Sequence, residues 1–124
     1  MAITILKKNR TECVVLMTGA GTQTITLSSL AMADETVASP KVDIKNIKFA
    51  INPAAKATIN RNSQEVISLT GTDHWAFDGY TLSMNPLHDI QIVNGDTDAT
   101  FILVLRKLAG YTPANDPQAT GILP

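Results

Sequence analysis

Residues whose chemistry often marks catalytic, redox or metal sites are scarce in this sequence. The chain has one cysteine, two histidines and one tryptophan among 124 residues. A single cysteine cannot form an intramolecular disulfide, so the core alone must hold the fold together. Cys13 lies in the apolar run of residues 13–17 with no basic neighbour that would favour its thiolate, and we expect it to be a small buried hydrophobic residue.

The sequence also lacks a charge imbalance and long apolar runs. Ten Lys and Arg against eleven Asp and Glu give a net charge of −1. With no basic excess to release counterions from a nucleic acid, direct nucleic-acid binding is not expected. The longest apolar runs have five residues, whereas roughly twenty are needed to cross a bilayer. The N-terminal residues also lack the apolar region of a signal peptide. We therefore expect the protein to be made in a cytoplasm and not to associate with a membrane.

The clearest pattern that is present lies in residues 89–107, DIQIVNGDTDATFILVLRK. Residues 101–105 are apolar at every position, which is typical of a central strand covered on both faces. Ile90 and Ile92 alternate with polar residues, as in a strand with one solvated face. Asn94-Gly95 between them tolerates positive φ, so the stretch predicts a β-hairpin.

The same alternation recurs along the chain. Residues 2–6 predict a short strand that ends at a polar turn, and residues 12–17 and 23–27 predict a second hairpin across a glycine turn. In residues 42–51 the apolar positions change parity near Lys45-Asn46, which predicts a β-bulge that keeps all of them on one face. These signals have the period of strands.

Together the patterns predict an all-β protein with a single antiparallel β-sandwich of seven to nine short strands, and a small β-barrel is the alternative. A chain of this length forms one domain and hides roughly two-thirds of its surface. We expect the sandwich to span residues 1–111. Gly110 ends the regular pattern, and residues 112–124 are rich in proline and predict an extended C-terminal tail. Residues 28–40 predict a loop or a single helical turn.

Candidate chemical sites are weak. His74 and His88 each adjoin an aspartate, Asp73 and Asp89, which suits a metal site or an acid–base pair. Backbone capping by these turn residues is the favoured interpretation, because a third histidine, a second cysteine and an HExxH spacing are all missing. Residues 96–98 resemble part of a calcium loop without its glycine and distal glutamate. We therefore expect no catalytic residues, no cofactor and no metal.

Half of the six aromatic residues, Trp75, Phe77 and Tyr80, lie within six positions of one another. Exposed aromatic rings stack well on sugars, so a carbohydrate-binding β-sandwich is the alternative function. Alternation places Trp75 and Phe77 on one face, as in a core, and we favour the core for Trp75. The pattern leaves Tyr80 open between the two.

The termini favour an interaction role. An edge strand at residues 2–6 offers open hydrogen-bond partners. The tail keeps apolar anchors along a proline-stiffened path, and such segments often order against a partner. A frayed terminus is the other interpretation. The candidate interface residues are Ile3, Ile5, Tyr80, Tyr111, Pro113, Pro117, Ile122 and Leu123.

Three stretches, KVDIKNIKFAINPAAKATINRN, SLTGTDHWAFDGYTLSMNP and DIQIVNGDTDATFILVLRKLAGY, resemble small virion structural proteins of tailed phages, particularly those of marine cyanobacteria and their neighbours. The resemblance covers residues 42–111. It implies a multi-copy, non-enzymatic component of the virion, made in the host cytoplasm. Such a component would be a capsid decoration or cement protein, or a neck or tail component. It would bind other virion proteins, or copies of itself, through sheet edges and termini.

Overall fold

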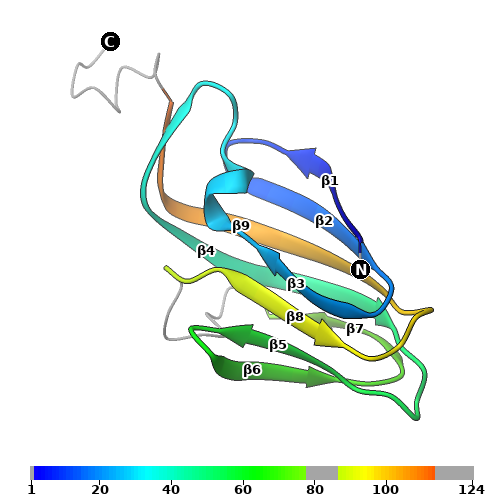
Figure 1. The fold of residues 1–124 in the computed structure, drawn as a ribbon. Coiled ribbons are helices and arrows are strands. Elements are labelled where there is room, and N and C mark those ends of the chain that lie inside the picture. Colours follow the sequence, from blue (N-terminus) through cyan, green and yellow to red (C-terminus); the bar gives the residue numbers. More distant parts are fainter. Residues whose placement is uncertain (1, 78–86, 114–124) are drawn as a thin grey trace.

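The fold is a two-layered antiparallel β-sandwich, as the sequence predicts (Figure 1). The computed structural model describes residues 2–77 and 87–113. Within these ranges the chain forms nine strands and one 3-10 helix. In chain order they are β1 (Ala2–Lys8), β2 (Glu12–Thr18), β3 (Gly21–Ile25), η1 (Leu27–Leu30), β4 (Glu35–Ala50), β5 (Ala57–Arg61), β6 (Gln64–Leu69), β7 (Thr72–Ala76), β8 (Ile90–Asn94) and β9 (Thr100–Pro113).

The strands form two sheets that enclose one core. The five-stranded sheet has the order β1-β2-β9-β4-β7, and the four-stranded sheet has the order β3-β8-β5-β6. Neither sheet closes on itself, so the barrel alternative is wrong. The inward residues of β2 and β9, Cys13 among them, are fully buried, and they pack against the isoleucines of β5 and β8. Cys13 is thus the buried hydrophobic residue that its context predicts.

Both predicted hairpins are wrong, because in each case the chain changes sheet at the turn. β2 pairs with β1 and β9, whereas β3 pairs with β8. β8 pairs with β3 and β5, whereas β9 pairs with β2 and β4. The side-chain amide of Asn94 ties the two crossings together by donating to the carbonyl oxygens of Gly19 and Asp96. The turns fall where expected, but they connect the two layers.

The predicted bulge in β4 is confirmed. Ile44 lies opposite Leu105, and Asn46 lies opposite Val104, so Lys45 is the extra residue. The bulge keeps Ile44 and Ile47 facing the core despite the change of parity. Upstream, η1 supplies the single helical turn, and β4 begins at Glu35, well before the strand that the sequence predicts from residue 42.

β9 does not end at Gly110, contrary to the sequence-based expectation. It passes through Gly110 at a φ of 88° and continues to Pro113, which pairs with Glu35. The first two residues of the expected tail therefore belong to the sheet, and residues 114–124 lie outside the described residues. Apolar alternation stops at this point, but backbone pairing with the early part of β4 continues.

The exposure of β9 and of Trp75 differs from what the sequence predicts. Ile102 and Val104 are half-buried on the outer face, so β9 is fully covered on one face only. Trp75 lies opposite Ile47 on the core side of the sheet, but β7 is an edge strand and 36% of Trp75 is exposed. Its assignment to the core is therefore wrong, whereas Phe77 is half-buried against the core.

Candidate functional site

The candidate site lies between β1 and β3, each of which is an edge strand of its sheet. A groove of about 550 Å³ runs between them. It is lined by Ile3, Thr4, Ile5, Thr24, Ile25, Thr26 and Ser29. None of these residues is charged. The lining therefore combines three isoleucine side chains with the hydroxyl-bearing side chains of threonine and serine.

The exposure of Ile5 follows from the register of β1. Ile3 lies opposite Met17 and Ile5 opposite Val15, both fully buried, so the two isoleucines face the core side of the sheet. Ile3 packs against the core, whereas Ile5 is 36% exposed. At this end of the sheet an apolar side chain that faces the core side is therefore partly exposed, because β1 is the edge strand among the described strands.

β1 is divided into two halves with different edge properties. Its pairing with β2 is irregular between Ile5 and Lys7, and Leu6, which lies in the irregularity, is 54% exposed. A bulge and lysines are devices that block the edge-to-edge addition of a further strand. They protect residues 6–8, but nothing comparable protects Ala2–Ile5. The half of the edge that lines the groove can therefore accept another strand.

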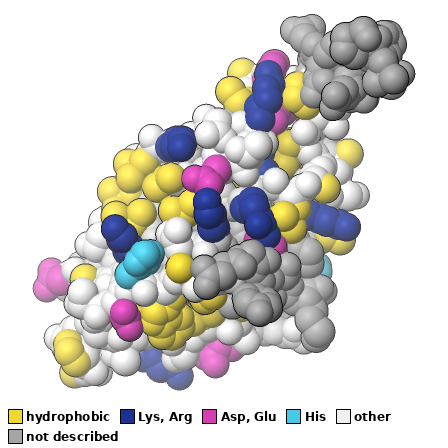
Figure 2. Space-filling model, turned by 180° about the vertical axis from the view of Figure 1, so that it is seen from behind, with side chains coloured by type: hydrophobic (Ala, Val, Ile, Leu, Met, Phe, Trp, Pro, Cys, Tyr) yellow, Lys and Arg dark blue, Asp and Glu magenta, His cyan; other side chains and the backbone are white. Residues whose placement is uncertain are grey.

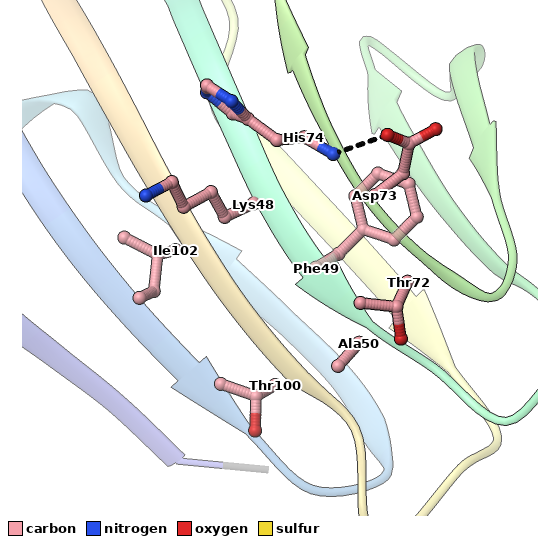
Figure 3. A pocket seen from close by; sticks show the side chains of 8 residues that line it. All are labelled: Lys48, Phe49, Ala50, Thr72, Asp73, His74, Thr100 and Ile102. Carbon is pink, nitrogen blue, oxygen red and sulfur yellow. Dashed lines mark hydrogen bonds between the residues drawn. The ribbon is translucent and has the colours of Figure 1, made fainter.

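A second, shallower hollow lies on the outer face of the five-stranded sheet (Figure 3). Its floor includes Ala50, Thr100 and Ile102, and the Lys48 side chain extends towards Ile102. His74 lies opposite Lys48 on β7. Figure 2 shows hydrophobic side chains on this side of the molecule beside a histidine and several Lys and Arg side chains. The surface that lines the hollow is mostly apolar, with Lys48, Asp73 and His74 among the lining residues.

Buried charges lie at the end of the sandwich where β4 begins. Lys107 Nζ is 2.6 Å from Glu35 Oε1, and both side chains are only 1% exposed. The same ammonium donates to the carbonyl oxygen of Asn9 and lies 4.4 Å from the centre of the Tyr111 ring. The Tyr111 hydroxyl donates to the carbonyl oxygen of Leu27, and burial raises the pKa of Tyr111. This cluster joins four segments of the chain and therefore stabilises this end of the sandwich.

Arg61 is a second buried cation, and it bridges the two sheets. From β5 it donates to the carbonyl oxygen of Val42 in β4 at 2.6 Å and to that of His88 just before β8. Burial lowers its pKa, and the nearby Asp43 and Asp89 carboxylates oppose that shift. Its guanidinium therefore satisfies backbone groups inside the sandwich.

The aspartates beside the histidines act as backbone caps, which confirms the favoured interpretation. Asp73 accepts from the N–H of His74 and from the indole N–H of Trp75, and these bonds lower the pKa of Asp73. Asp89 accepts from the N–H of Leu27. Asp96 accepts from the backbone of Asn52 and Asp98, which lowers its pKa. Within residues 2–77 and 87–113, no three His, Cys, Asp or Glu side chains gather as a metal site would require.

The candidate interface residues have different locations. Ile3 and Ile5 line the groove, as an edge-strand role requires. Tyr111 and Pro113 belong to β9, and Tyr111 is held within the sandwich by its hydroxyl. Tyr80, Pro117, Ile122 and Leu123 lie outside the described residues.

Sequence reasoning missed the second wall of the groove and the buried cluster around Lys107. Ile25 and Thr24 read as one strand of a hairpin, and only the pairing of β3 with β8 places them beside β1. Glu35 and Lys107 are 72 residues apart and look like ordinary surface charges. Lys107 ends a predicted strand, but Glu35 fell in a stretch that was predicted as a loop or a helical turn, so nothing in the sequence linked the two.

Two further observations bear on function. Among the described residues, no helix is long and apolar enough to cross a membrane. No protein-family model, characterised protein or solved structure is significantly similar to this chain.

Proposed function

We propose that this protein is a non-catalytic structural component of a virus particle, present in many copies and bound to other virion proteins through its sheet edges. The open groove between β1 and β3 is the observation that carries the proposal. Among the described strands, β1 and β3 each have one edge without a partner strand, and the groove beside these edges has an uncharged, mainly apolar lining. Such an edge binds an extended segment of a partner through backbone hydrogen bonds, with side chains seated in the groove.

The resemblance to phage virion proteins supports the same function, and the near-neutral charge suits contact with protein rather than nucleic acid. A capsid decoration or cement protein and a neck or tail component both need a compact scaffold with edges that accept neighbours. The sandwich provides the scaffold through its buried core and its internal charge cluster.

The proposal predicts that the protein is part of purified particles. Mass spectrometry of particles from a source that expresses the protein is expected to find it in a stoichiometric, multi-copy amount. Particles made with Ile5→Lys are expected to lose most of the protein, because the lysine places a charge in an apolar groove. Val93→Lys is the matched control, since Val93 is 39% exposed on the opposite layer. Particles that lack the wild-type protein in an expressing source contradict the proposal.

A carbohydrate-binding module is the second candidate function, and the exposure of Trp75 favours it. The indole is 36% exposed at the edge strand β7, and its N–H donates to Asp73 Oδ2 at 3.1 Å. Its ring packs edge-on against Phe49, with the ring centres 5.7 Å apart. This packing orients the indole, as a sugar-stacking platform requires, and it serves equally to close the edge of the core.

Trp75 is the only tryptophan, so its fluorescence reports directly on this question. Under the leading proposal, the emission of Trp75 is expected to stay constant when mono- and oligosaccharides are added, because the indole acts as packing for β7. A saturable change in emission that disappears in Trp75→Phe favours the carbohydrate-binding module instead. Free tryptophan in the same sugar solutions controls for optical effects.

A further inference from the structure

We propose that residues 117–124 of one copy occupy the groove between β1 and β3 of a second copy, adding a strand beside Ala2–Ile5. This inference rests on the proposed assembly function and names the partner of the groove. It follows from the dimensions of the free edge, from the chemistry of the groove and from the direction in which β9 leaves the sandwich.

The free edge sets the length of the occupant. Only residues 2–5 of β1 lack edge protection, because the irregularity at Leu6 and the two lysines follow. Four residues of an added strand cover about 13 Å of this edge. The facing strand β3 is also an edge strand, so a segment that enters here lies between the two sheets.

The lining sets the chemistry of the occupant. The groove is lined by Ile3, Ile5 and Ile25 and by threonine and serine side chains, with no charged group in its lining. A suitable segment is uncharged, has a branched aliphatic side chain facing in, and has small or hydroxyl residues beside it. An acidic or basic segment would have to lose its hydration without gaining a partner.

Residues 117–124, PQATGILP, match these requirements. These eight residues include no charged side chain. In an added strand Thr120 and Ile122 would face the same side, so that Ile122 could enter the groove with Thr120 beside its threonine and serine side chains. Pro117 and Pro124 bracket the segment and limit the added strand to the residues between them, since proline cannot donate to a ladder.

The path of β9 favours a second copy over the same chain. In the sheet, the free half of β1 pairs with the part of β2 that in turn pairs with Phe101 and Leu103 of β9. Pro113 is ten residues beyond Leu103, paired with the start of β4. In Figure 1, the last part of β9 lies at the opposite end of the sandwich from the start of β1. The chain is thus directed away from its own groove, and exchange between copies joins them head to tail.

Disulfide trapping tests this arrangement directly on the full-length chain. Variants Ile5→Cys and Ile122→Cys are purified separately, mixed and oxidised. The expected product is a disulfide-linked dimer that contains one chain of each. Cys13 does not interfere because it is fully buried. Val93→Cys mixed with Ile122→Cys is the matched control and is expected to give background levels only.

A soluble peptide provides an independent measurement. Residues 117–124 as a synthetic peptide are expected to bind the full-length chain, and Ile5→Lys is expected to weaken binding by about tenfold or more. Circular dichroism establishes that each variant is folded. Ile5→Thr, which adds no charge, is expected to weaken binding less than Ile5→Lys.

Equal trapping at positions 5 and 93, or no trapping together with no peptide binding, overturns the inference. A chain that carries both Ile5→Cys and Ile122→Cys also overturns it if its disulfide closes within that chain and the product remains a monomer. Each proposal can fail alone. Incorporation into particles without trapping and without peptide binding rejects only this inference, whereas trapping by a protein that is missing from particles rejects only the virion function.

Discussion

Replacing Lys107 with methionine is expected to lower the free energy of unfolding by about 3–5 kcal/mol, the range for removing one partner of a buried ion pair. The substitution leaves the Glu35 carboxylate 1% exposed and without its ammonium partner. Arg10, whose guanidinium lies 3.8 Å from Glu35, is itself half-exposed and compensates only in part. The carbonyl oxygen of Asn9 also loses its donor. Urea unfolding followed by Trp75 fluorescence measures the loss.

The same chain offers a matched control for this prediction. Lys45 forms an ion pair with Glu12 at 3.0 Å, but those side chains are 49% and 27% exposed. Lys45→Met is therefore expected to cost no more than about 1 kcal/mol. The double variant Glu35→Gln/Lys107→Met is expected to regain part of the lost stability, because neither charge remains and glutamine still accepts from Met32. Equal losses for Lys45→Met and Lys107→Met contradict the structural role of the cluster.

Replacing Gly110 with alanine is expected to lower the free energy of unfolding by about 2–4 kcal/mol. Gly110 has a φ of 88°, which an L side chain adopts only with strain. A Cβ at this position would lie 2.4 Å from Pro40 Cα and 2.7 Å from the carbonyl oxygen of Ala38. Both atoms belong to the backbone of β4, so the two strands have to separate where they pair beyond the core.

Gly95→Ala is the control for this second prediction, because no atom lies within 4 Å of the Cβ it would add. Its free energy of unfolding is expected to stay within about 1 kcal/mol of the wild type. A Gly110→Ala variant as stable as Gly95→Ala contradicts the close approach of β9 to Pro40. Loss of stability in Gly110→Ala alone supports it, and amide exchange at Val37 and Tyr111 then reports whether this part of the β4–β9 pairing opens.

The sequence by itself determined the class of fold and the inward face of most strands. Alternation at period two specifies which side of a strand is apolar, and so it predicted the burial of Cys13 and the bulge at Lys45. The capping roles of Asp73 and Asp89 were also predictable, because a short acidic side chain bonds backbone amides at turns and strand ends. The sequence also marked Ile3 and Ile5 as residues of an edge strand, and in the structure both line the groove.

Only the tertiary structure decided which strands are neighbours. A turn such as Asn94-Gly95-Asp96 has the same local chemistry in a hairpin and in a crossing between layers, so the pattern could not distinguish them. The same limit explains Trp75, whose parity is that of a core residue although its strand lies at an edge. Alternation describes one strand, whereas exposure depends on what lies beside it.

The groove and the buried charge cluster could not be predicted from the sequence for the same physical reason. The sequence marked Ile5 as an edge residue, but the groove beside it exists only because β3 lies next to β1 in the folded protein. Lys107 became a buried cation only when β4 brought Glu35 beside it from 72 residues away. Burial and pairing arise from contacts between distant segments, which the period of a single strand does not encode.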